Sequence, residues 1–358
     1  MGETTMKLYN SITLNGAYLD GPQLVDYCKN ELASKKTPDW LVDIYRFLLE
    51  WTNDSEEIKA HTSGSTGEPK LILLKKKHMI ASAIKTNSFL NLSKEKSALL
   101  CLSANYIAGK MMIVRALVSG FNLITIQPSG NPLENLNHSI DFTAMVPLQV
   151  SNCIGEVLKG EKVKQIIIGG GAISKTLVAK LRNSQTVCYE TYGMTETVSH
   201  VAIKKVGDEV FEAMPGVAFS LDDRNCLVIE ANDIADSVIV TNDIVNLISD
   251  QKFIWLGRFD NIINTGGIKV VPEEIEAKLT NRIPGQFYIS SIPDVKLGEK
   301  LVLVVEENNV INDISQIKAL ISHLSNYEQP KQVCIVQKFP LTETDKIKRA
   351  DLKQLIKL

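Results

Sequence analysis

The feature that most constrains the fold is an alternation of two hydrophobic patterns between residues 97 and 193. Short apolar runs rich in β-branched residues, typical of buried strands, lie at 97–103, 121–126, 141–147, 164–170 and 186–193. Apolar residues recur at helical spacing in the intervening segments 108–120, 148–160 and 174–183. Strands that alternate with helices predict βαβ units, and therefore a mainly parallel sheet covered by helices.

The pattern changes after residue 205. Consecutive short apolar runs without helices, up to residue 256, predict an antiparallel β subdomain. After Gly257 the pattern becomes mixed α+β, and Pro272 with its following acidic residues starts a predicted helix. We expect an α/β fold with a large N-terminal domain over residues 1–257 and a small α+β C-terminal domain over residues 258–358; the resemblance given below implies that the small domain is mobile.

Composition excludes several classes of protein. With 358 residues, 44% of them hydrophobic, the chain can bury a sizeable core. The net charge of −2 gives no basic field for nucleic acid or an anionic membrane, so an anionic ligand must be bound locally. The six cysteines lack metal-ligand spacing and are expected to be reduced. Because no apolar run reaches the length of a membrane span and no signal segment is visible, we expect a cytoplasmic protein, of undetermined oligomeric state.

A loop rich in glycine, serine and threonine, HTSGSTGEPKLI (residues 61–72), joins two predicted strands at 56–60 and 70–75. Glycine permits close backbone approach, and successive amides and hydroxyls can surround phosphate oxygens. The spacing fails the Walker pattern GxxxxGK[ST], and composition alone favours a plain turn. The candidate phosphate ligands are Thr62, Ser63, Gly64, Ser65, Thr66, Gly67 and Lys70.

The full string TSGSTGEPK resembles the phosphate-loop signature of the adenylate-forming superfamily, which comprises acyl-CoA synthetases, luciferases and peptide-synthetase adenylation domains. Further segments match in the family's order: GGGAIS (169–174), YETYGMTET (189–197), VTND (240–243), GRFDNIINTGGIKVVPEEIE (257–276) and PLTETDKIKR (340–349). The resemblance implies an AMP-forming acid–thiol ligase that uses ATP, Mg²⁺ and coenzyme A. The chain is shorter than most members, and we expect the missing length to come from the first subdomain.

The resemblance assigns roles within these segments. Tyr192 would stack on adenine, Thr195 would meet the α-phosphate and Glu196 would bind Mg²⁺, roles that suit an aromatic face, a hydroxyl and a carboxylate. Asp243 would accept the ribose hydroxyls, with Arg258 beside it. Each residue in isolation also fits an ordinary turn or cap. The further matching ATP-binding positions are Gly170, Gly171, Gly193 and Met194.

The C-terminal segments carry the remaining assignments. Asp260 matches the hinge about which the small domain would rotate. Gly266 and Gly267 would lie against the pantetheine arm of coenzyme A, although they also fit a tight turn. Lys346 would stabilise charge in the first half-reaction, whereas in isolation it would be a solvated surface charge. The predicted catalytic residues are Lys346, Thr195 and Glu196.

Two positions depart from the family pattern, which has glycine at both. Asn242 precedes Asp243, and Asp345 precedes Lys346. Because Asn and Asp tolerate positive φ best among the other residues, we expect both loops to keep their backbone shape. Asp345 also adds negative charge beside a lysine meant to meet phosphate, which we expect to slow adenylation.

The acid is predicted from residues 103–120, where family members carry an acyl-pocket segment. Tyr106 stands at the usual aromatic or histidine gate, and Arg115 lies in an otherwise apolar helical stretch. The segment looks like that of 2-succinylbenzoate:CoA ligases of menaquinone biosynthesis, so Arg115 could hold the carboxylate that is not activated. Alternatively, Arg115 snorkels or pairs with a structural acid. Ala172 completes the predicted substrate-binding set.

We therefore expect an ATP-dependent ligase that converts a small carboxylic acid, 2-succinylbenzoate, to its adenylate and then to its CoA thioester. One alternative is an acyl-CoA synthetase for another aryl or fatty acid. A second is an adenylation module that loads a carrier protein, which would require the holo-carrier instead of free coenzyme A. A third is a non-catalytic nucleotide binder, which would bind ATP without acid-dependent release of pyrophosphate.

Overall fold

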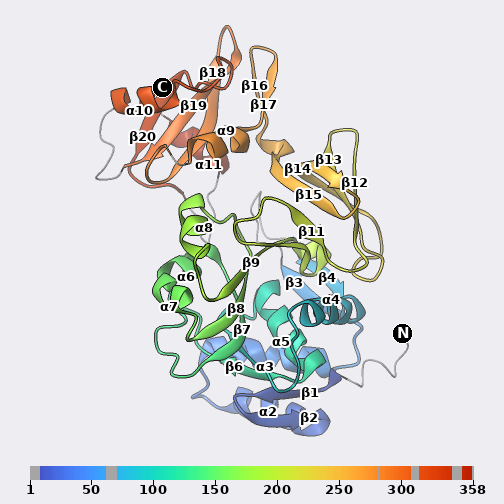
Figure 1. Cartoon of the computed structure of the whole chain (residues 1–358). Coiled ribbons are helices and arrows are strands. Elements are labelled where there is room, and N and C mark those ends of the chain that lie inside the picture. Colours follow the sequence, from blue (N-terminus) through green and yellow to red (C-terminus); the bar gives the residue numbers. More distant parts are fainter. Residues whose placement is uncertain (1–8, 62–70, 281, 308–313, 341–348, 357–358) are drawn as a thin grey trace. The chain divides into compact units, whose positions relative to one another are not determined.

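The computed structural model describes residues 9–61, 71–280, 282–307, 314–340 and 349–356, and they form two compact units (Figure 1). The first unit holds the residues up to Phe219 together with Ile229–Ile239, and the second holds Ser220–Val228 and the residues from Val240 onward. Both combine helices with sheets, which confirms the predicted α/β class. The boundary predicted after residue 257 concerns a domain that moves, which compactness does not test, so it remains a prediction.

The centre of the first unit is the predicted parallel sheet, in the order β9-β8-β7-β5-β6. Its strands are β5 (Ser97–Leu100), β6 (Asn122–Thr125), β7 (Ile140–Met145), β8 (Val163–Ile168) and β9 (Val187–Gly193). On one side β1 (Ser11–Leu14) and β2 (Ala17–Asp20) follow β6; on the other, β10 (His200–Lys205) and β11 (Phe211–Ala213) continue antiparallel from β9. The predicted strands are therefore confirmed to within a few residues.

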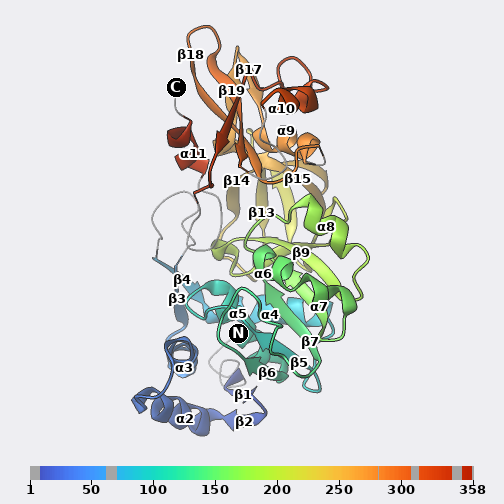
Figure 2. The same ribbon diagram turned by 90° about the vertical axis from the view of Figure 1, so that its left-hand side faces the viewer.

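The helices of this unit cover both faces of the sheet (Figures 1 and 2). One face carries α6 (Pro147–Asn152), α7 (Ile154–Lys159) and α8 (Lys175–Leu181), whose apolar residues share a core with β7 and β8. The other carries α4 (Lys76–Phe89) packed against α5 (Ile107–Ser119). The single helix predicted over 148–160 is wrong, because the backbone at Cys153 (φ −106°, ψ 29°) leaves the helical region and divides it.

The order of the strands indicates where a ligand would bind. From β5 the chain moves to β6 on one side, and then to β7, β8 and β9 on the other. In open α/β sheets, ligands bind outside the carboxyl ends of the strands at such a reversal. The residues that follow β5, β7, β8 and β9 are therefore the ones to examine.

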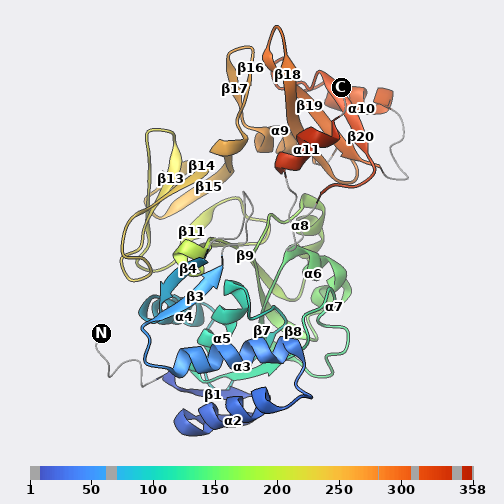
Figure 3. The ribbon, with the colours of Figure 1, turned by 180° about the vertical axis from the view of Figure 1, so that it is seen from behind.

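The N-terminal elements add a helical layer and a hairpin. Helices α2 (Gly21–Ala33) and α3 (Asp39–Thr52) lie side by side (Figure 3). The strands predicted at 56–60 and 70–75 are confirmed as β3 (Glu57–His61) and β4 (Leu71–Lys75), which pair antiparallel. The phosphate loop between them, residues 62–70, lies outside the described residues.

The second unit begins with an antiparallel sheet, in the order β12 (Ala218–Leu221), β13 (Cys226–Glu230), β14 (Ile239–Ser249) and β15 (Lys252–Arg258). This confirms the predicted β subdomain, but the separate strands expected before and after Asp243 are one strand of 11 residues. The polar pair Asn242–Asp243 resembles a turn in sequence. It stays in the strand because the Thr241 hydroxyl accepts a hydrogen bond from the Asp243 amide at 3.0 Å.

A second sheet completes this unit, with strands ordered β17-β16-β19-β18 and β20 beside β19. Its strands are β16 (Ile263–Thr265), β17 (Ile268–Val270), β18 (Phe287–Asp294), β19 (Gly298–Glu306) and β20 (Gln332–Val336). Helices α9 (Pro272–Leu279), which starts at Pro272 as predicted, and α10 (Ile314–Ile321) share one apolar core, and α11 (Arg349–Leu355) contributes to another.

Two further expectations concern the chain as a whole. All six cysteines are free, and five of them are buried. Within the described part of the chain, no helix has the length and apolar character that crossing a membrane requires.

Candidate active site

Two neighbouring parallel strands bring several of the predicted nucleotide residues to one edge of the sheet. Because β8 pairs with β9, the loop with Gly170, Gly171 and Ala172 lies beside the end of β9, which carries Tyr192. The Thr191 hydroxyl ties the two ends by donating to the Ile168 carbonyl at 3.1 Å. The loop residues 170–172 are exposed. These predicted residues therefore share the edge at which a ligand is expected.

The side chain of Tyr192 is partly buried at this edge. Its ring packs against Phe211, with 5.9 Å between the ring centroids and 59° between the planes. A ring held by a neighbour in this way keeps a fixed orientation, which suits a stacking surface.

The loop after β9 requires glycine at its first position. A Cβ atom on Gly193 would lie 2.3 Å from the carbonyl oxygen of Ser199, which is closer than any side chain allows. The backbone of Gly193 therefore touches the segment that leads into β10. This close approach explains the glycine without reference to a ligand.

A threonine that the sequence analysis did not single out holds this loop together. Thr197 is fully buried, and its hydroxyl accepts from the Met194 amide at 2.9 Å and lies 2.7 Å from the Ser199 carbonyl. It thereby fixes the short 3₁₀ helix of residues 195–197 that carries Thr195 and the exposed Glu196. Its position inside the matched segment YGMTET was the one signal for it.

The geometry around Glu196 bears on magnesium. Among the residues that the structure describes, no three or more His, Cys, Asp or Glu side chains group as a metal site. Mg²⁺ is commonly held by one or two carboxylates together with substrate phosphates and water. One exposed carboxylate beside a nucleotide edge fits that mode of binding.

Helix α5 and the residue directly before it provide the two side chains predicted to bind the acid. Tyr106 directly precedes the helix and is 37% exposed. Arg115, further along it, is only 2% exposed, so the predicted alternative of a snorkelling side chain is wrong. Burial lowers the pKa of Arg115 to about 10, so the guanidinium still carries its charge at neutral pH.

The partners of Arg115 are neutral. Its Nη2 donates to the hydroxyl of Ser199 at 2.8 Å, and its Nη1 lies 3.6 Å from the sulfur of Met112. Its Nε is buried and has no hydrogen-bond partner among the residues that the structure describes. No aspartate or glutamate in the described part of the chain forms an ion pair with it. The structural acid of the other alternative is therefore not found among those residues.

The second unit brings Asp243 and Arg258 together, as the ribose assignment requires. They lie opposite each other on β14 and β15, with 3.9 Å between Nη1 of Arg258 and Oδ1 of Asp243. The indole of Trp255 also donates to Oδ1 of Asp243, at 3.1 Å. Trp255 had no signal in the sequence, because this contact depends on a register shift between Ile244 and Val245.

Asn242, the first departure from the family pattern, contacts the predicted hinge. Its amide donates to the carboxylate of Asp260 at 3.2 Å, and Nη2 of Arg258 donates to the same carboxylate at 2.6 Å. The oxygen of Asn242 accepts from Arg224 at 2.9 Å. The expected need for positive φ does not arise at Asn242, because it lies inside a strand.

Gly266 and Gly267 form the tight turn of the β16–β17 hairpin. Their φ angles are 60° and 81°, and the flanking Thr265 and Ile268 pair with each other. A two-residue hairpin turn with both φ values positive requires residues such as glycine. The turn is thus confirmed, while contact with coenzyme A remains a prediction.

The other catalytic assignment cannot be placed. Lys346 and the neighbouring Asp345 lie outside the described residues, as do the phosphate ligands between Thr62 and Lys70.

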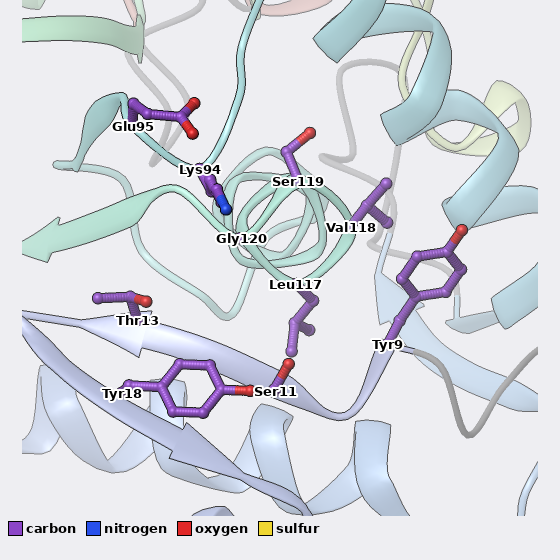
Figure 4. Close-up of a pocket in the computed structure, with 10 residues that line it drawn as sticks. All are labelled: Tyr9, Ser11, Thr13, Tyr18, Lys94, Glu95, Leu117, Val118, Ser119 and Gly120. Atoms are coloured by element: carbon purple, nitrogen blue, oxygen red, sulfur yellow. The ribbon is translucent and has the colours of Figure 1, made fainter.

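A pocket of about 560 Å³ opens elsewhere on the first unit, between the β1–β2 hairpin and the C-terminal end of α5 (Figure 4). Tyr18, Lys94 and Ser119 contribute to its lining. Tyr106 lies at the opposite end of α5, and none of the predicted site residues lines this pocket.

Comparison with known proteins identifies the family of this chain. A family model for AMP-binding enzymes matches residues 58–231. An acyl-CoA synthetase (AMP-forming)/AMP-acid ligase II-like protein from Dyadobacter fermentans is 34% identical, with 92% of this chain and 97% of that chain covered and a TM-score of 0.60. The o-succinylbenzoate CoA synthetase (MenE) of Bacillus subtilis, solved with the acyl-adenylate intermediate OSB-AMP, has a similar fold at 18% identity, with 86% and 73% of the two chains covered and a TM-score of 0.73.

Curated relatives are longer. The 2-succinylbenzoate–CoA ligase of Salmonella typhimurium is 25% identical over 75% of this chain, and the match spans 62% of its own length, which is less than two thirds. The ordered motifs, the two-part α/β fold and these similarities confirm the predicted resemblance. This chain belongs to the AMP-binding, adenylate-forming family of enzymes.

Proposed function

We propose that this chain is an ATP-dependent acid–CoA ligase whose acid is 2-succinylbenzoate. The observation that supports 2-succinylbenzoate as the acid is the buried charge of Arg115, which has only neutral partners among the described residues. A buried arginine without a carboxylate is unfavourable, and the second carboxylate of a dicarboxylic acid supplies the missing charge. Curated relatives are named 2-succinylbenzoate–CoA ligases, which supports the same acid.

The first step forms an acyl adenylate. One carboxylate oxygen of the acid attacks the α-phosphorus of ATP, the bond to the bridging oxygen breaks, and pyrophosphate leaves. Because the chain forms no covalent bond, its contribution is positioning and electrostatic stabilisation. Tyr192 would bind adenine, Asp243 and Arg258 the ribose, and Thr195 the α-phosphate, while Lys346 and the loop 62–70 would stabilise the phosphate charge.

Glu196 is the proposed protein ligand of Mg²⁺. Its exposed carboxylate would provide the protein ligand, and the remaining ligands would come from phosphate oxygens and water. When bound, the ion supplies neutralisation of the phosphate charge.

The second step transfers the acyl group to coenzyme A. The thiol, as its thiolate, attacks the adenylate carbonyl carbon, the carbon–oxygen bond to phosphate breaks, and AMP leaves. Rotation about Asp260 would withdraw Lys346 and bring the turn at Gly266 and Gly267 to the pantetheine arm. The contacts of Asp260 with Asn242 and Arg258 would then have to break in one of the two states.

The test measures pyrophosphate release from Mg·ATP with 2-succinylbenzoate, benzoate and medium-chain fatty acids, each with and without coenzyme A. The matched acid is 3-benzoylpropionate, which lacks the ring carboxylate. In Arg115→Met we expect KM for 2-succinylbenzoate to rise about 100-fold while the constants for 3-benzoylpropionate change little. Equal KM values for 2-succinylbenzoate in both proteins would remove the main support for this substrate.

The same assay separates the alternatives. Pyrophosphate release without thioester formation from coenzyme A would indicate a carrier protein as acceptor. ATP binding with no release for any acid would indicate a non-catalytic nucleotide binder. Lys346→Ala should abolish release with every acid, because it removes charge stabilisation in the adenylating step.

A further inference from the structure

The Ser199 hydroxyl that meets Arg115 belongs to a longer buried chain of hydrogen bonds. Oγ of Ser199 lies 3.3 Å from Nδ1 of His200, and Nε2 of the same imidazole lies 3.4 Å from Oγ1 of Thr86. Thr86 in turn donates to the carbonyl of Ser82 at 3.1 Å. The chain joins β10 to α4 and α5, and His200 is only 6% exposed.

The direction of each hydrogen bond in this series follows from the Ser82 carbonyl at its end. A carbonyl oxygen can only accept, so the Thr86 hydrogen points to Ser82, and Thr86 must accept from Nε2 of His200. A neutral imidazole that carries its hydrogen on Nε2 has a free lone pair on Nδ1. Ser199 therefore donates to Nδ1, and its oxygen is left to accept from Arg115.

This series of hydrogen bonds requires a neutral His200 imidazole with its hydrogen on Nε2. If His200 were protonated, both ring nitrogens would donate, Ser199 would have no acceptor there, and a second positive charge would stand beside Arg115. Burial, and to a lesser extent the charge of Arg115, lowers the pKa of His200 to about 3. The geometry and the surroundings thus agree on a neutral His200.

A strained backbone turn holds Ser199 where its hydroxyl meets both Arg115 and His200. Val198 has φ 63° and ψ −50°, which a β-branched residue rarely adopts, and the Ser199 amide donates to the Thr197 carbonyl at 2.6 Å. Such strain persists only where the surrounding structure enforces it. Here Val198 is buried, and Gly193 leaves room for the Ser199 carbonyl.

We infer that Ser199 and His200 are positioning residues that hold the Arg115 guanidinium in one orientation toward the second carboxylate of the acid. A neutral His200 adds no positive charge beside Arg115, and it directs Ser199 to accept from Arg115. Nε of Arg115, which has no hydrogen-bond partner among the described residues, is then left for the ligand. The inference rests on the proposed function.

The hydrogen-bond chain can be tested without any activity. In protein labelled with ¹⁵N-histidine, the imidazole signals of His200, assigned by their loss in His200→Asn, should show hydrogen on Nε2 and no titration between pH 5 and 8. Arg115→Met should raise the pKa of His200, because it removes the neighbouring charge. Hydrogen on Nδ1, or titration near pH 6.5 in the wild type, would overturn the inference.

Kinetics test the role in acid binding. Ser199→Ala should raise KM for 2-succinylbenzoate about 10-fold, the loss expected for one hydrogen bond to a charged group, with little change in kcat or in KM for ATP. His200→Leu should behave likewise, whereas His200→Asn and Ser199→Thr, which keep an acceptor or a hydroxyl, should stay close to the wild type. The constants for 3-benzoylpropionate should not respond to these changes.

A matched control lies on the same helix as Arg115. Ser119→Ala removes a hydrogen bond of 2.7 Å from Asn87 without reaching the guanidinium, so KM for 2-succinylbenzoate should not change. If Ser199→Ala affected both acids equally, its role would be merely structural and the inference would fail. If the wild type used 2-succinylbenzoate and neither Ser199→Ala nor His200→Leu raised its KM, the inference would fail while the function stood. If the wild type activated no acid at all, the proposed function would fail, and the role in acid binding with it.

Discussion

Each of the two units contains an arginine that is at least partly buried, and their surroundings differ. In the second unit, Arg349 donates to both oxygens of Glu276, at 3.0 and 2.6 Å, and lies 3.7 Å from Glu273. Burial alone would lower the pKa of Arg349, but the Glu276 carboxylate outweighs it and raises the pKa. In the first unit, Arg115 contacts a hydroxyl and a thioether.

The difference separates an arginine whose charge is balanced within its own unit from one for which we propose that a bound acid supplies the balancing charge. The charge of Arg349 is balanced by carboxylates of the same unit, in the bidentate geometry that guanidinium favours. The charge of Arg115 finds no such balance among the described residues, although both side chains are held by hydrogen bonds. A buried arginine is therefore informative about function only once its partners are known.

The largest effect is expected where an internal pair is broken. Glu276→Gln leaves the partly buried charge of Arg349 without its bidentate carboxylate, and we expect the free energy of unfolding to fall by about 1.5 to 3 kcal/mol. Denaturation by urea, monitored by circular dichroism, measures it. The control is Glu274→Gln two residues earlier on α9, for which a change within about 0.5 kcal/mol is expected. Equal losses in both variants would contradict the assignment of Glu276 as the balancing charge.

Arg115→Met should not lower the free energy of unfolding as Glu276→Gln does. Because the buried charge has no carboxylate partner in the described part of the chain, its removal should leave the free energy of unfolding unchanged or raise it by up to about 2 kcal/mol. Arg349→Met should lower it, since two carboxylates would lose their partner. The same denaturation experiment compares the two variants, and a loss at Arg115 as large as that at Arg349 would erase the distinction.

The neutral state of His200 predicts a dependence of stability on pH. Its pKa of about 3 lies below the unfolded value of 6.5, so the unfolded chain binds the extra proton between these values. Stability is therefore present above pH 6.5 and is lost as pH falls, by up to about 1.4 kcal/mol per pH unit. Subtracting the same titration of His200→Asn isolates the contribution of this residue. Parallel curves for the two proteins would contradict it.

The smallest effect is expected for an exposed pair in the second unit. Lys278 donates to Glu328 at 2.6 Å, but the lysine side chain is 50% exposed. Lys278→Ala should cost about 0.2 to 1 kcal/mol, because solvent screens such pairs and ordering two side chains opposes them. A cost comparable to that of Glu276→Gln would show that burial is not what separates the two pairs.

Periodicity predicted much of the fold, because regular spacing survives in a single sequence. The parallel strands and α5 followed from it directly. It failed at Cys153 and at Asn242, where backbone geometry or a hydrogen bond made by Thr241 decides the local structure. Local features of this kind do not change the spacing of hydrophobic residues, so periodicity cannot predict them.

The candidate site was predictable only in part. Motifs located Tyr192 and Asp243, and an apolar helical pattern singled out Arg115 without deciding whether it is buried or reaches solvent. The hydrogen-bond network that links Arg115 through Ser199 and His200 to Thr86 was not predictable, because its members come from segments far apart in the sequence. Hydrogen-bond direction also requires the coordinates, since it depends on which atoms face each other.

The turn at Val198 also bears on how this enzyme can evolve. Backbone strain of this kind holds about 1 to 3 kcal/mol, and a substitution that relaxed it would raise the heat resistance of the protein. The same relaxation would release Ser199 from its place beside Arg115. If Arg115 binds the acid as we propose, selection for thermal stability and selection for the choice of acid act on one residue in opposite directions, and variants from hot environments should show how that conflict is resolved.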